Sequence, residues 1–340
     1  MLVFPSIARI AIIGCGHMGA THARELAAMP HAEVVAFVDP RREAAEKLRD
    51  AIGAGNVHEL AEPVLVSDDV DAVIIATHHH LHRPLTEQAA AAGKHVFVEK
   101  PLAITAADCD AMIAAVERHG IKLMTGFQAR FSPFLHAMRA AIPEPWVSSG
   151  QLVDPRWGDQ SWANDPIEGG GNVLSQGCHL FDALCFLHGS APVSVYAKGG
   201  NFHHPQHDIV DGVCCVIEFA NGRMASAIVG DFGAPALLGK AAYQLFAGDR
   251  TATLSGYYTD PVLQCWRAEP ERMTVADLPE PLRNDKGAHG YTQQMQAFLR
   301  WLTHDEAPEH ACTVWDGARA TRIGLAAIAS LRSGSPVALA

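Results

Sequence analysis

One residue of this chain has the type and placement that proton transfer at a sheet edge requires. Lys100 comes directly after the apolar run 95–98 and Glu99, at the carboxyl end of a predicted buried strand. Ligands of open α/β sheets bind at that end, where an ammonium group is partly desolvated and its pKa can fall toward a useful value. Glu99 could hold the ammonium in place. The alternative is an ordinary exposed lysine in a strand-to-helix turn.

A second candidate is His179, which lies in the strongly apolar segment 172–187. If this segment is one helix, Ser175, His179 and Asp182 are spaced i, i+4 and i+7 and share one face. A polar stripe on a buried helix requires partners or a cavity. We therefore predict that His179 is an acid–base group whose tautomer Asp182 fixes, with a hydrogen-bonded core histidine as the alternative.

A glycine cluster near the start has the spacing of a dinucleotide site. Gly14, Gly16 and Gly19 follow the apolar run 10–13, so that GxGxxG closes a predicted strand and opens a predicted helix. Gly14 permits the tight turn, Gly16 lets the backbone approach a pyrophosphate, and Gly19 lets helix and strand pack closely. The amides of His17 and Met18 would then face the phosphates at the helix N-terminus.

An acidic residue follows at the expected distance. Asp39, about 20 residues after Gly19, comes at the end of the apolar run 34–38. It would accept hydrogen bonds from the adenosine ribose and repel a 2′-phosphate, which predicts NAD as the cofactor. Arg41 follows closely and could soften that preference, so NADP stays an alternative.

These residues lie on a predicted α/β framework in the first third of the chain. The strands do not alternate in polarity, as expected of a parallel sheet that is covered on both faces. The predicted strands are 9–13, 34–39, 72–76, 95–98 and 122–125, and the predicted helices are 18–28, 41–50, 84–92 and 106–119.

After about residue 126 the pattern changes to antiparallel strands and apolar helices. Asn221-Gly222 is a strong hairpin signal and Gly248-Asp249 a weaker one. The predicted strands are 193–197, 213–219, 223–229 and 243–247, and the helices are 133–141, 172–187, 291–302 and 315–331. We therefore predict a doubly wound Rossmann domain over 1–125 and an α+β domain with a large, mostly antiparallel open sheet over 126–340, whose C-terminal helix could pack back toward the first domain.

Composition narrows the class of protein. The 340 residues carry a net charge of −11, which argues against nucleic acid and against an anionic membrane surface as partners. No apolar run reaches the roughly 18 residues of a membrane span. The eight cysteines form no CxxC pair, so we expect free thiols in a reducing cytoplasm.

Two histidine runs suggest possible metal sites, because imidazole is a good zinc or nickel ligand. They are His78, His79, His80 and His82, and His203, His204 and His207. No acidic or thiol residue is spaced to complete either set, so we predict no functional metal. The first run should line the nicotinamide–ribose pocket, and the second should be a surface loop between strands.

With these features the chain resembles the Gfo/Idh/MocA family, typified by glucose–fructose oxidoreductase and inositol dehydrogenase. The resemblance rests on three further segments and on the C-terminal pattern from Asp316-Gly317 to Val337, and so spans nearly the whole chain. The segments are Thr77-His78-His79-His80-Leu81-His82, Glu99-Lys100-Pro101, and Gly169-Gly170-Gly171 followed by Gly177, His179 and Asp182.

The resemblance implies roles for these positions. Thr77, His79, His82 and Glu99 would contact the cofactor, and Lys100, ahead of a cis peptide to Pro101, would hydrogen-bond the substrate hydroxyl. It also implies a homodimer or homotetramer that packs through the large sheet. The sequence departs from the family at Ser175, where many members have an aspartate, because a serine cannot act as a base near neutral pH.

Three further residues are candidates for the substrate pocket. Arg130 follows Gly126-Phe127-Gln128, where the family has a substrate-side segment. Trp162 precedes the glycine triplet and could form a wall for a sugar ring, with core packing as the alternative. Tyr291 begins a predicted helix and could reach the pocket from there.

We therefore expect an NAD-dependent dehydrogenase that acts on a secondary alcohol of a sugar, sugar derivative or cyclitol. Lys100 and His179 would draw the hydroxyl proton as hydride leaves for nicotinamide C4. Two alternatives stay open: a glycosidase that oxidises its sugar transiently with bound NAD, and a non-catalytic NAD-binding sensor or regulator, which Ser175 favours slightly.

Overall fold

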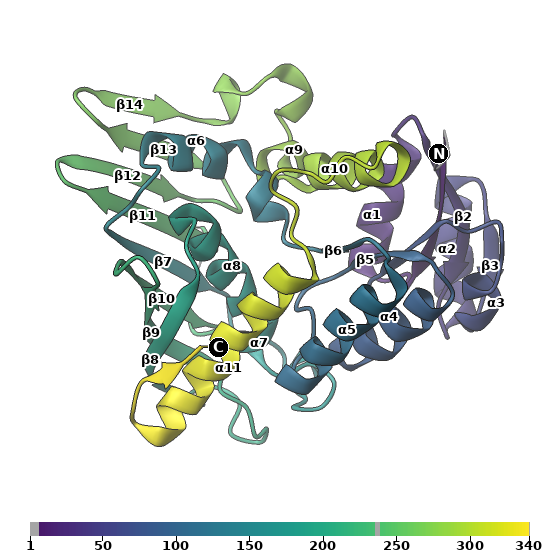
Figure 1. Ribbon diagram of the computed structural model, residues 1–340, viewed down its shortest axis with the longest axis horizontal. Helices are drawn as coiled ribbons and strands as arrows, with labels where there is room; N and C mark the ends of the chain where they lie inside the picture. Colours follow the sequence, from purple (N-terminus) through teal and green to yellow (C-terminus); the bar gives the residue numbers. More distant parts are fainter. Residues whose placement is uncertain (1–6, 235–238, 340) are drawn as a thin grey trace. The chain divides into compact units, whose positions relative to one another are not determined.

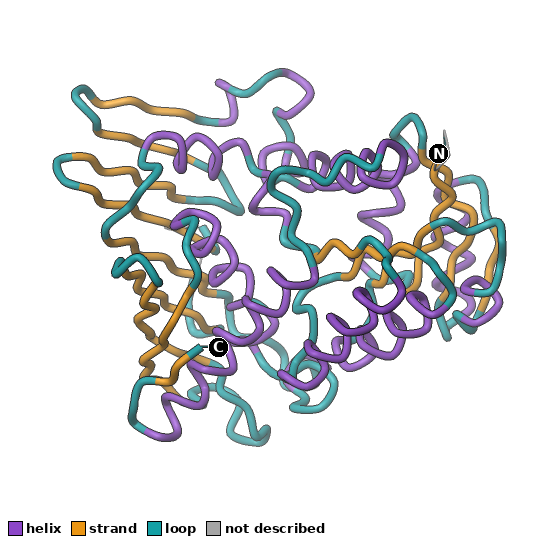
Figure 2. Tube along the Cα trace, in the orientation of Figure 1, coloured by secondary structure: helices purple, strands orange, loops and turns teal. Residues whose placement is uncertain are grey.

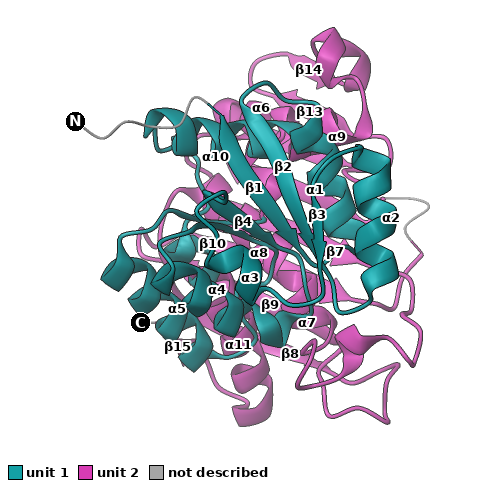
Figure 3. Ribbon diagram, turned by 90° about the vertical axis from the view of Figure 1, so that its right-hand side faces the viewer, with its two compact units in different colours: residues 1–126, 292–318 teal, residues 127–291, 319–340 magenta. Residues whose placement is uncertain are grey.

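The computed structural model describes residues 7–234 and 239–339 (Figure 1). The chain forms two compact units (Figure 3). The first comprises Met1–Gly126 and Thr292–Ala318, and the second comprises Phe127–Tyr291 and Arg319–Ala340. The chain therefore leaves the first unit, completes most of the second, and returns.

The first unit contains a six-stranded parallel sheet with the order β3-β2-β1-β4-β5-β6. Its strands are β1 (Ala8–Ile13), β2 (Ala32–Val38), β3 (Asn56–His58), β4 (Ala72–Ile75), β5 (His95–Val98) and β6 (Leu123–Thr125). The order reverses between β1 and β4, and ligands of such sheets bind at the carboxyl ends of the strands at that point. The predicted doubly wound sheet is confirmed.

Helices cover both faces of this sheet, because right-handed crossovers on either side of the reversal place their helices on opposite faces (Figure 1). They are α1 (His17–Ala27), α2 (Arg42–Ile52), α3 (Glu62–Leu65), α4 (His82–Ala91) and α5 (Ala106–His119), followed late in the chain by most of α10 (Tyr291–His304) and the start of α11 (Val314–Ser333). The five strands predicted from apolar runs are all present, whereas the short β3 and α3 were missed.

The second unit is built on a nine-stranded sheet with the order β14-β13-β12-β11-β7-β10-β9-β8-β15. Its strands are drawn in orange in Figure 2. All neighbours are antiparallel except β7 and β10. The strands are β7 (Val147–Val153), β8 (Pro192–Gly200), β9 (Gly212–Phe219), β10 (Met224–Gly230), β11 (Ala241–Ala247), β12 (Arg250–Ser255), β13 (Val262–Trp266), β14 (Pro270–Met273) and β15 (Val337–Ala338). The predicted antiparallel sheet is confirmed.

Both predicted hairpins are present. Gly222, in the turn between β9 and β10, has φ +75°, and Gly248, between β11 and β12, has φ +63°. The helices of this unit are α6 (Pro133–Ala141), α7 (Asn172–Ser175), α8 (Gly177–His188), α9 (Asp285–His289) and the rest of α11. The single helix predicted over 172–187 is wrong: the helix is interrupted at Gln176, so α7 and α8 are separate.

In the part of the chain that the structure describes, helices of this unit cover one face of the large sheet, and α8 packs closely on its centre. A Cβ on Gly150 of β7 would lie 2.5 Å from Leu180 of α8. Along β9 the side chains alternate: Ile217 is buried, whereas Val216 and Glu218 on either side of it are exposed. One face therefore forms the core of this unit and the other lies open.

Candidate active site

The glycine turn after β1 has the geometry that a phosphate-binding turn requires. Gly14 has φ +94°, and a Cβ there would lie 2.3 Å from the Ala76 carbonyl oxygen. A Cβ on Gly19 would lie 1.9 Å from the Gly14 carbonyl oxygen, so strand and helix pack with no room for a side chain. A Cβ on Gly16 would meet nothing within 4 Å. The space that a pyrophosphate needs is therefore open over Gly16, where α1 begins with His17 and Met18.

Asp39 is held by the same turn. It is 5% exposed, its Oδ2 accepts the Cys15 N–H at 3.0 Å, and its Oδ1 accepts the Arg41 N–H at 2.9 Å. The exposed Arg41 side chain places Nε 3.5 Å from the same Oδ1. Asp39, which was expected to favour NAD, and Arg41, which was expected to soften that preference, thus lie side by side. Burial and the Asp39 carboxylate raise the pKa of the Cys15 thiol to about 12, so this thiol stays protonated.

Glu99 and Lys100 lie at the end of β5, directly before a cis peptide bond to Pro101. Glu99 is buried, its Oε1 lies 2.7 Å from His22 Nε2 of α1, and its Oε2 accepts the Lys100 N–H at 3.2 Å. Burial alone would raise the pKa of Glu99. The hydrogen bond with His22 and the charges of His22 and Lys100 outweigh burial, so the pKa falls below its usual value. Glu99 is therefore an anion that ties α1 to the Lys100 backbone, and His22 is a site residue that the sequence analysis missed.

The histidine loop after β4 packs against this turn. His82 is fully buried, with Nδ1 2.9 Å from the Pro101 carbonyl oxygen and Nε2 3.3 Å from that of Thr77. Burial lowers the pKa of His82 below its ordinary value, although both carbonyl oxygens act to raise it. His79 is also buried, with its ring 5.6 Å from that of His82. His82 thus links the Thr77 loop to the Lys100–Pro101 turn.

In the second unit, Ser175, His179 and Asp182 are all buried. Ser175 ends α7, whereas His179 and Asp182 belong to α8, so the interruption at Gln176 breaks the helix on which their shared face was predicted. The rings of His179 and Phe127 meet edge to face at 5.7 Å.

Arg130 and Asp182 form a buried ion pair. Arg130 lies in the short 3₁₀ helix η2 (Gln128–Phe131) and is 6% exposed, and Asp182 is 1% exposed. Arg130 Nε lies 2.8 Å from Asp182 Oδ2, and Nη2 lies 2.6 Å from Oδ1. This two-pronged geometry fixes the carboxylate with high specificity. Asp182 therefore has a cationic partner that the sequence analysis did not assign to it.

The glycine triplet lies in a loop, whereas the predicted pocket aromatics Trp162 and Tyr291 each begin a helix. A Cβ on Gly169 would lie 2.3 Å from Ala163 Cα, and Gly171 has φ +82°, so these glycines let one chain segment approach another. Trp162, at the start of the 3₁₀ helix η3 (Trp162–Asn164), is half-buried. Tyr291 is half-buried too, and the Lys286 ammonium lies 4.7 Å from the centre of its ring.

A polar group beside Ser175 was not predicted. Lys240 Nζ lies 2.9 Å from Asp154 Oδ1 and 2.8 Å from Gln176 Oε1. Asp154 follows β7 and Lys240 precedes β11, and Lys240 O accepts the Val153 N–H, so two strands distant in sequence bring the ions together. Asp154, Gln176 and Lys240 are too far apart in the sequence to form a recognisable motif. The one signal in the sequence was that Gln176 is adjacent to the candidate residue Ser175.

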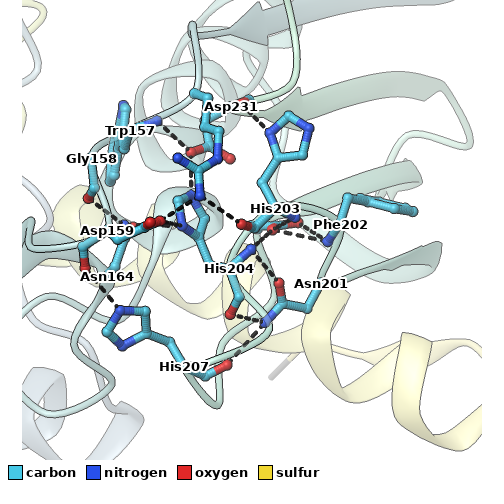
Figure 4. A network of polar contacts seen from close by, with 12 residues as sticks. Trp157, Gly158, Asp159, Asn164, Asn201, Phe202, His203, His204, His207 and Asp231 are labelled. Atoms are coloured by element: carbon cyan, nitrogen blue, oxygen red, sulfur yellow. Dashed lines mark hydrogen bonds and ion pairs between the residues drawn. The ribbon is translucent and has the colours of Figure 1, made fainter.

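The second histidine run differs from the prediction of a surface loop. It lies between β8 and β9, but His204 is 0% exposed and its Nε2 lies 2.7 Å from Asp231 Oδ2 (Figure 4). The part of the prediction that placed His204 on the surface is wrong, because its buried ring contacts the buried Asp231 carboxylate.

Among the described residues, no helix is both long enough and apolar enough to cross a membrane.

Comparison with known proteins relates both units to one family. Residues 8–127 match the oxidoreductase family with the NAD-binding Rossmann fold, and residues 135–236 match the Gfo/Idh/MocA C-terminal domain. The chain is 26% identical over 339 residues to the uncharacterized oxidoreductase YrbE of Bacillus subtilis, covering 96% of this chain and 95% of the relative. It is 34% identical over 224 residues to inositol 2-dehydrogenase of Rhizobium meliloti, covering 64% of this chain and 67% of the relative.

Among solved structures, aldose-aldose oxidoreductase from Caulobacter crescentus complexed with glycerol superposes with a TM-score of 0.85. The match covers 98% of this chain and 100% of that chain at 24% identity. At this identity the likeness concerns the fold alone.

Proposed function

Because the chain belongs to the Gfo/Idh/MocA family of NAD(P)-binding oxidoreductases, we propose that it is a dehydrogenase of secondary alcohols. Hydride would pass between nicotinamide C4 and a carbon of a sugar, sugar derivative or cyclitol. The proposal rests on one observation: the Glu99-Lys100-Pro101 turn lies at the carboxyl edge of the sheet and is fixed there by the His22–Glu99 bond. The inositol activity in the name of the similar Rhizobium meliloti protein supports this class of substrate.

The residues of the first unit fit a dinucleotide. The open space over Gly16 and the amides at the start of α1 suit a pyrophosphate, and the second lone pairs of the Asp39 oxygens suit ribose hydroxyls. Asp39 supports NAD over NADP, which its charge would repel. Thr77, His79 and His82 would line the nicotinamide side. When bound, the nicotinamide supplies the hydride acceptor.

The protein would orient the alcohol and move its proton. In the oxidation direction Lys100 would hydrogen-bond the substrate hydroxyl, and Lys100 and His179 would take its proton. Ser175 would donate or accept one hydrogen bond at the substrate, but it would hold no charge. Arg130, Trp162 and Tyr291 are proposed to shape the substrate pocket. Asp182 would act there mainly through its bond to Arg130.

We also propose that the protein is a cytoplasmic homodimer or homotetramer. Among the described residues the cysteines form no disulfide bond, which suits a reducing compartment. The open face of the large sheet exposes Tyr196, Val216 and Ile228, three apolar side chains on neighbouring strands β8, β9 and β10. Such a face is a natural contact between copies of the chain.

The test is a panel of sugars, sugar acids and cyclitols, assayed separately for reduction of NAD and of NADP. Lys100→Met and His179→Gln should each reduce turnover by roughly 10²–10⁴-fold, the range for lost acid–base assistance. NAD binding, measured by calorimetry, should change little. The matched controls Lys47→Met and His119→Gln alter exposed residues and should keep full activity.

Three outcomes would contradict the dehydrogenase. Near-normal turnover in Lys100→Met would remove the proposed mechanism. NAD binding without reduction by any substrate would favour a sensor. Sugar release from a glycoside without net consumption of NAD would favour the glycosidase.

A further inference from the structure

Three buried side chains of the second unit converge, and Figure 4 shows two of them, His204 and Asp231. His204 and Asp211 come from the loop between β8 and β9, and Asp231 directly follows β10. All three are 0% exposed. Each offers one nitrogen or carboxylate oxygen, and these atoms all lie within 4.8 Å of one another.

The loop backbone fixes the first carboxylate. Asp211 Oδ1 accepts the Phe202 N–H at 2.8 Å, and Oδ2 accepts the N–H groups of His203 at 2.6 Å and His204 at 3.2 Å. The bond to the His204 backbone fixes the start of that side chain as well. Two of the three groups are therefore placed before any ligand arrives.

The second carboxylate is incompletely satisfied. Asp231 Oδ2 accepts the Trp157 N–H at 2.9 Å and lies 2.7 Å from His204 Nε2. The other oxygen, Oδ1, is buried and has no hydrogen-bond partner among residues 7–234 and 239–339. A buried carboxylate oxygen without a partner is costly, and a bound cation would remove that cost.

The local charges also require a cation. Among the described residues, no lysine or arginine forms an ion pair with Asp211 or Asp231. The nearby Arg156 instead pairs with Asp159 and donates to the His203 carbonyl oxygen. One imidazole thus lies within 4.8 Å of two buried carboxylates, of which only Asp231 contacts its ring nitrogen. A dication would neutralise the pair.

Both ring nitrogens of His204 have polar neighbours. Nδ1 lies 3.4 Å from Asn164 Nδ2 and 3.6 Å from Asp159 Oδ1, on the side of the ring away from Asp231 (Figure 4). The 2.7 Å between His204 Nε2 and Asp231 Oδ2 is close to the roughly 3 Å between adjacent ligands of a six-coordinate ion with bonds of about 2.1 Å.

We propose that His204, Asp211 and Asp231 bind one divalent transition-metal ion of the Zn²⁺ or Mn²⁺ type, to which one imidazole and two carboxylates are suited. The ion joins three segments: the loop that carries Trp157 and Asp159, the loop that carries His204, and the end of β10. Its role is structural. The sequence analysis rejected a metal because no acid seemed correctly spaced. The two acids lie 7 and 27 residues from His204, and the fold brings them together.

The full-length protein, stripped with EDTA and dialysed, is titrated with ZnCl₂ and separately with MnCl₂ by calorimetry. We expect one ion per chain and a melting temperature that rises with metal, because only the folded state binds it. His204→Gln and Asp231→Asn should each abolish this binding. Asp159→Asn, at an exposed second contact, should weaken it about 10–100-fold. His119→Gln is the matched control and should bind as the wild type does.

Absence of binding by the wild type at millimolar Zn²⁺ and Mn²⁺ would overturn the proposal, as would unchanged binding in both His204→Gln and Asp231→Asn. In that case His204 and Asp231 form a hydrogen-bonded pair, and EDTA leaves the melting temperature unchanged. If the variants do not fold, Co²⁺ added to the wild type decides. A visible absorption band that excess Zn²⁺ abolishes supports the site, and no band contradicts it.

Discussion

The buried Arg130–Asp182 pair permits a quantitative test of the second unit. Asp182→Asn keeps the size of the side chain but removes its charge, and so removes the buried two-pronged ion pair with Arg130. Because the side chains are only 8% and 1% exposed, solvent can replace little of the lost interaction. Loss of one partner from a buried pair costs about 3–5 kcal/mol. For a cooperative unit of this size, that lowers the melting temperature by roughly 6–20 °C.

The matched control is Glu144→Gln, which breaks a pair with Arg223 of similar length, 2.8 Å, in which Glu144 is 74% exposed. We expect no measurable change there, because exposed pairs are solvated and screened. Melting followed by calorimetry compares the two variants, and Arg130→Met should cost as much as Asp182→Asn. The double variant Arg130→Met/Asp182→Leu should recover much of the loss, since it leaves no buried charge. If Asp182→Asn melts within about 1 °C of the control, the pair does not support the fold as argued.

Three further predictions concern the cofactor unit. Gly16→Ala should keep the wild-type melting temperature but lose NAD binding, measured by calorimetry. Gly19→Ala should instead destabilise the fold, because its Cβ would meet the Gly14 carbonyl oxygen at 1.9 Å. If the two variants behave alike, the assignment of Gly16 to the pyrophosphate and of Gly19 to helix packing is wrong. Asp39→Ala should weaken NAD binding and narrow the gap to NADP in paired titrations, and a wild type that prefers NADP severalfold would show that Asp39 does not discriminate. The pKa of Glu99 is lowered in the folded state despite its burial, so its stabilising contribution is complete above the ordinary value of 4.5 and is lost as the pH falls below it. His22→Gln should therefore flatten the pH dependence of the urea unfolding midpoint below about pH 5. If the midpoint changes with pH as steeply as in the wild type, the His22–Glu99 bond does not lower the pKa of Glu99.

Much of the first unit could be predicted because most of its strands are recognisable from their sequence pattern. Runs such as 10–13 and 34–38 are continuous and apolar, and the positions of Gly14 and Gly19 follow from a close approach that any side chain would block. The strand β3 was not predicted, because only one of its three residues, Val57, is apolar. β7 was missed for another reason: Ser148, Ser149 and Gln151 carry no strand signal, and the strand exists because β10 and β11 pair with it on both sides.

Contacts between distant residues account for what was missed in the candidate site. The Glu-Lys-Pro turn was predicted, but its partner His22 lies 77 residues away from Glu99. The break between α7 and α8 is invisible in an apolar pattern. Directly after it, Gly177 packs closely on the sheet, since a Cβ there would lie 3.0 Å from Val229 of β10. The pairing of Arg130 with Asp182 spans 52 residues and likewise follows from the fold, not from spacing.

The return of the chain to its first unit affects how the protein is made. Phe298 of α10 packs on Phe97 with ring centres 5.6 Å apart, and the Cys312 carbonyl oxygen accepts the Thr125 N–H at 2.7 Å. A ribosome releases residues 1–126 long before it has made these partners. The nucleotide-binding half therefore emerges first and is completed late, after nearly all of the other half has been synthesised. During that interval its sheet lacks part of its apolar cover, so chaperones have a longer time in which to bind it.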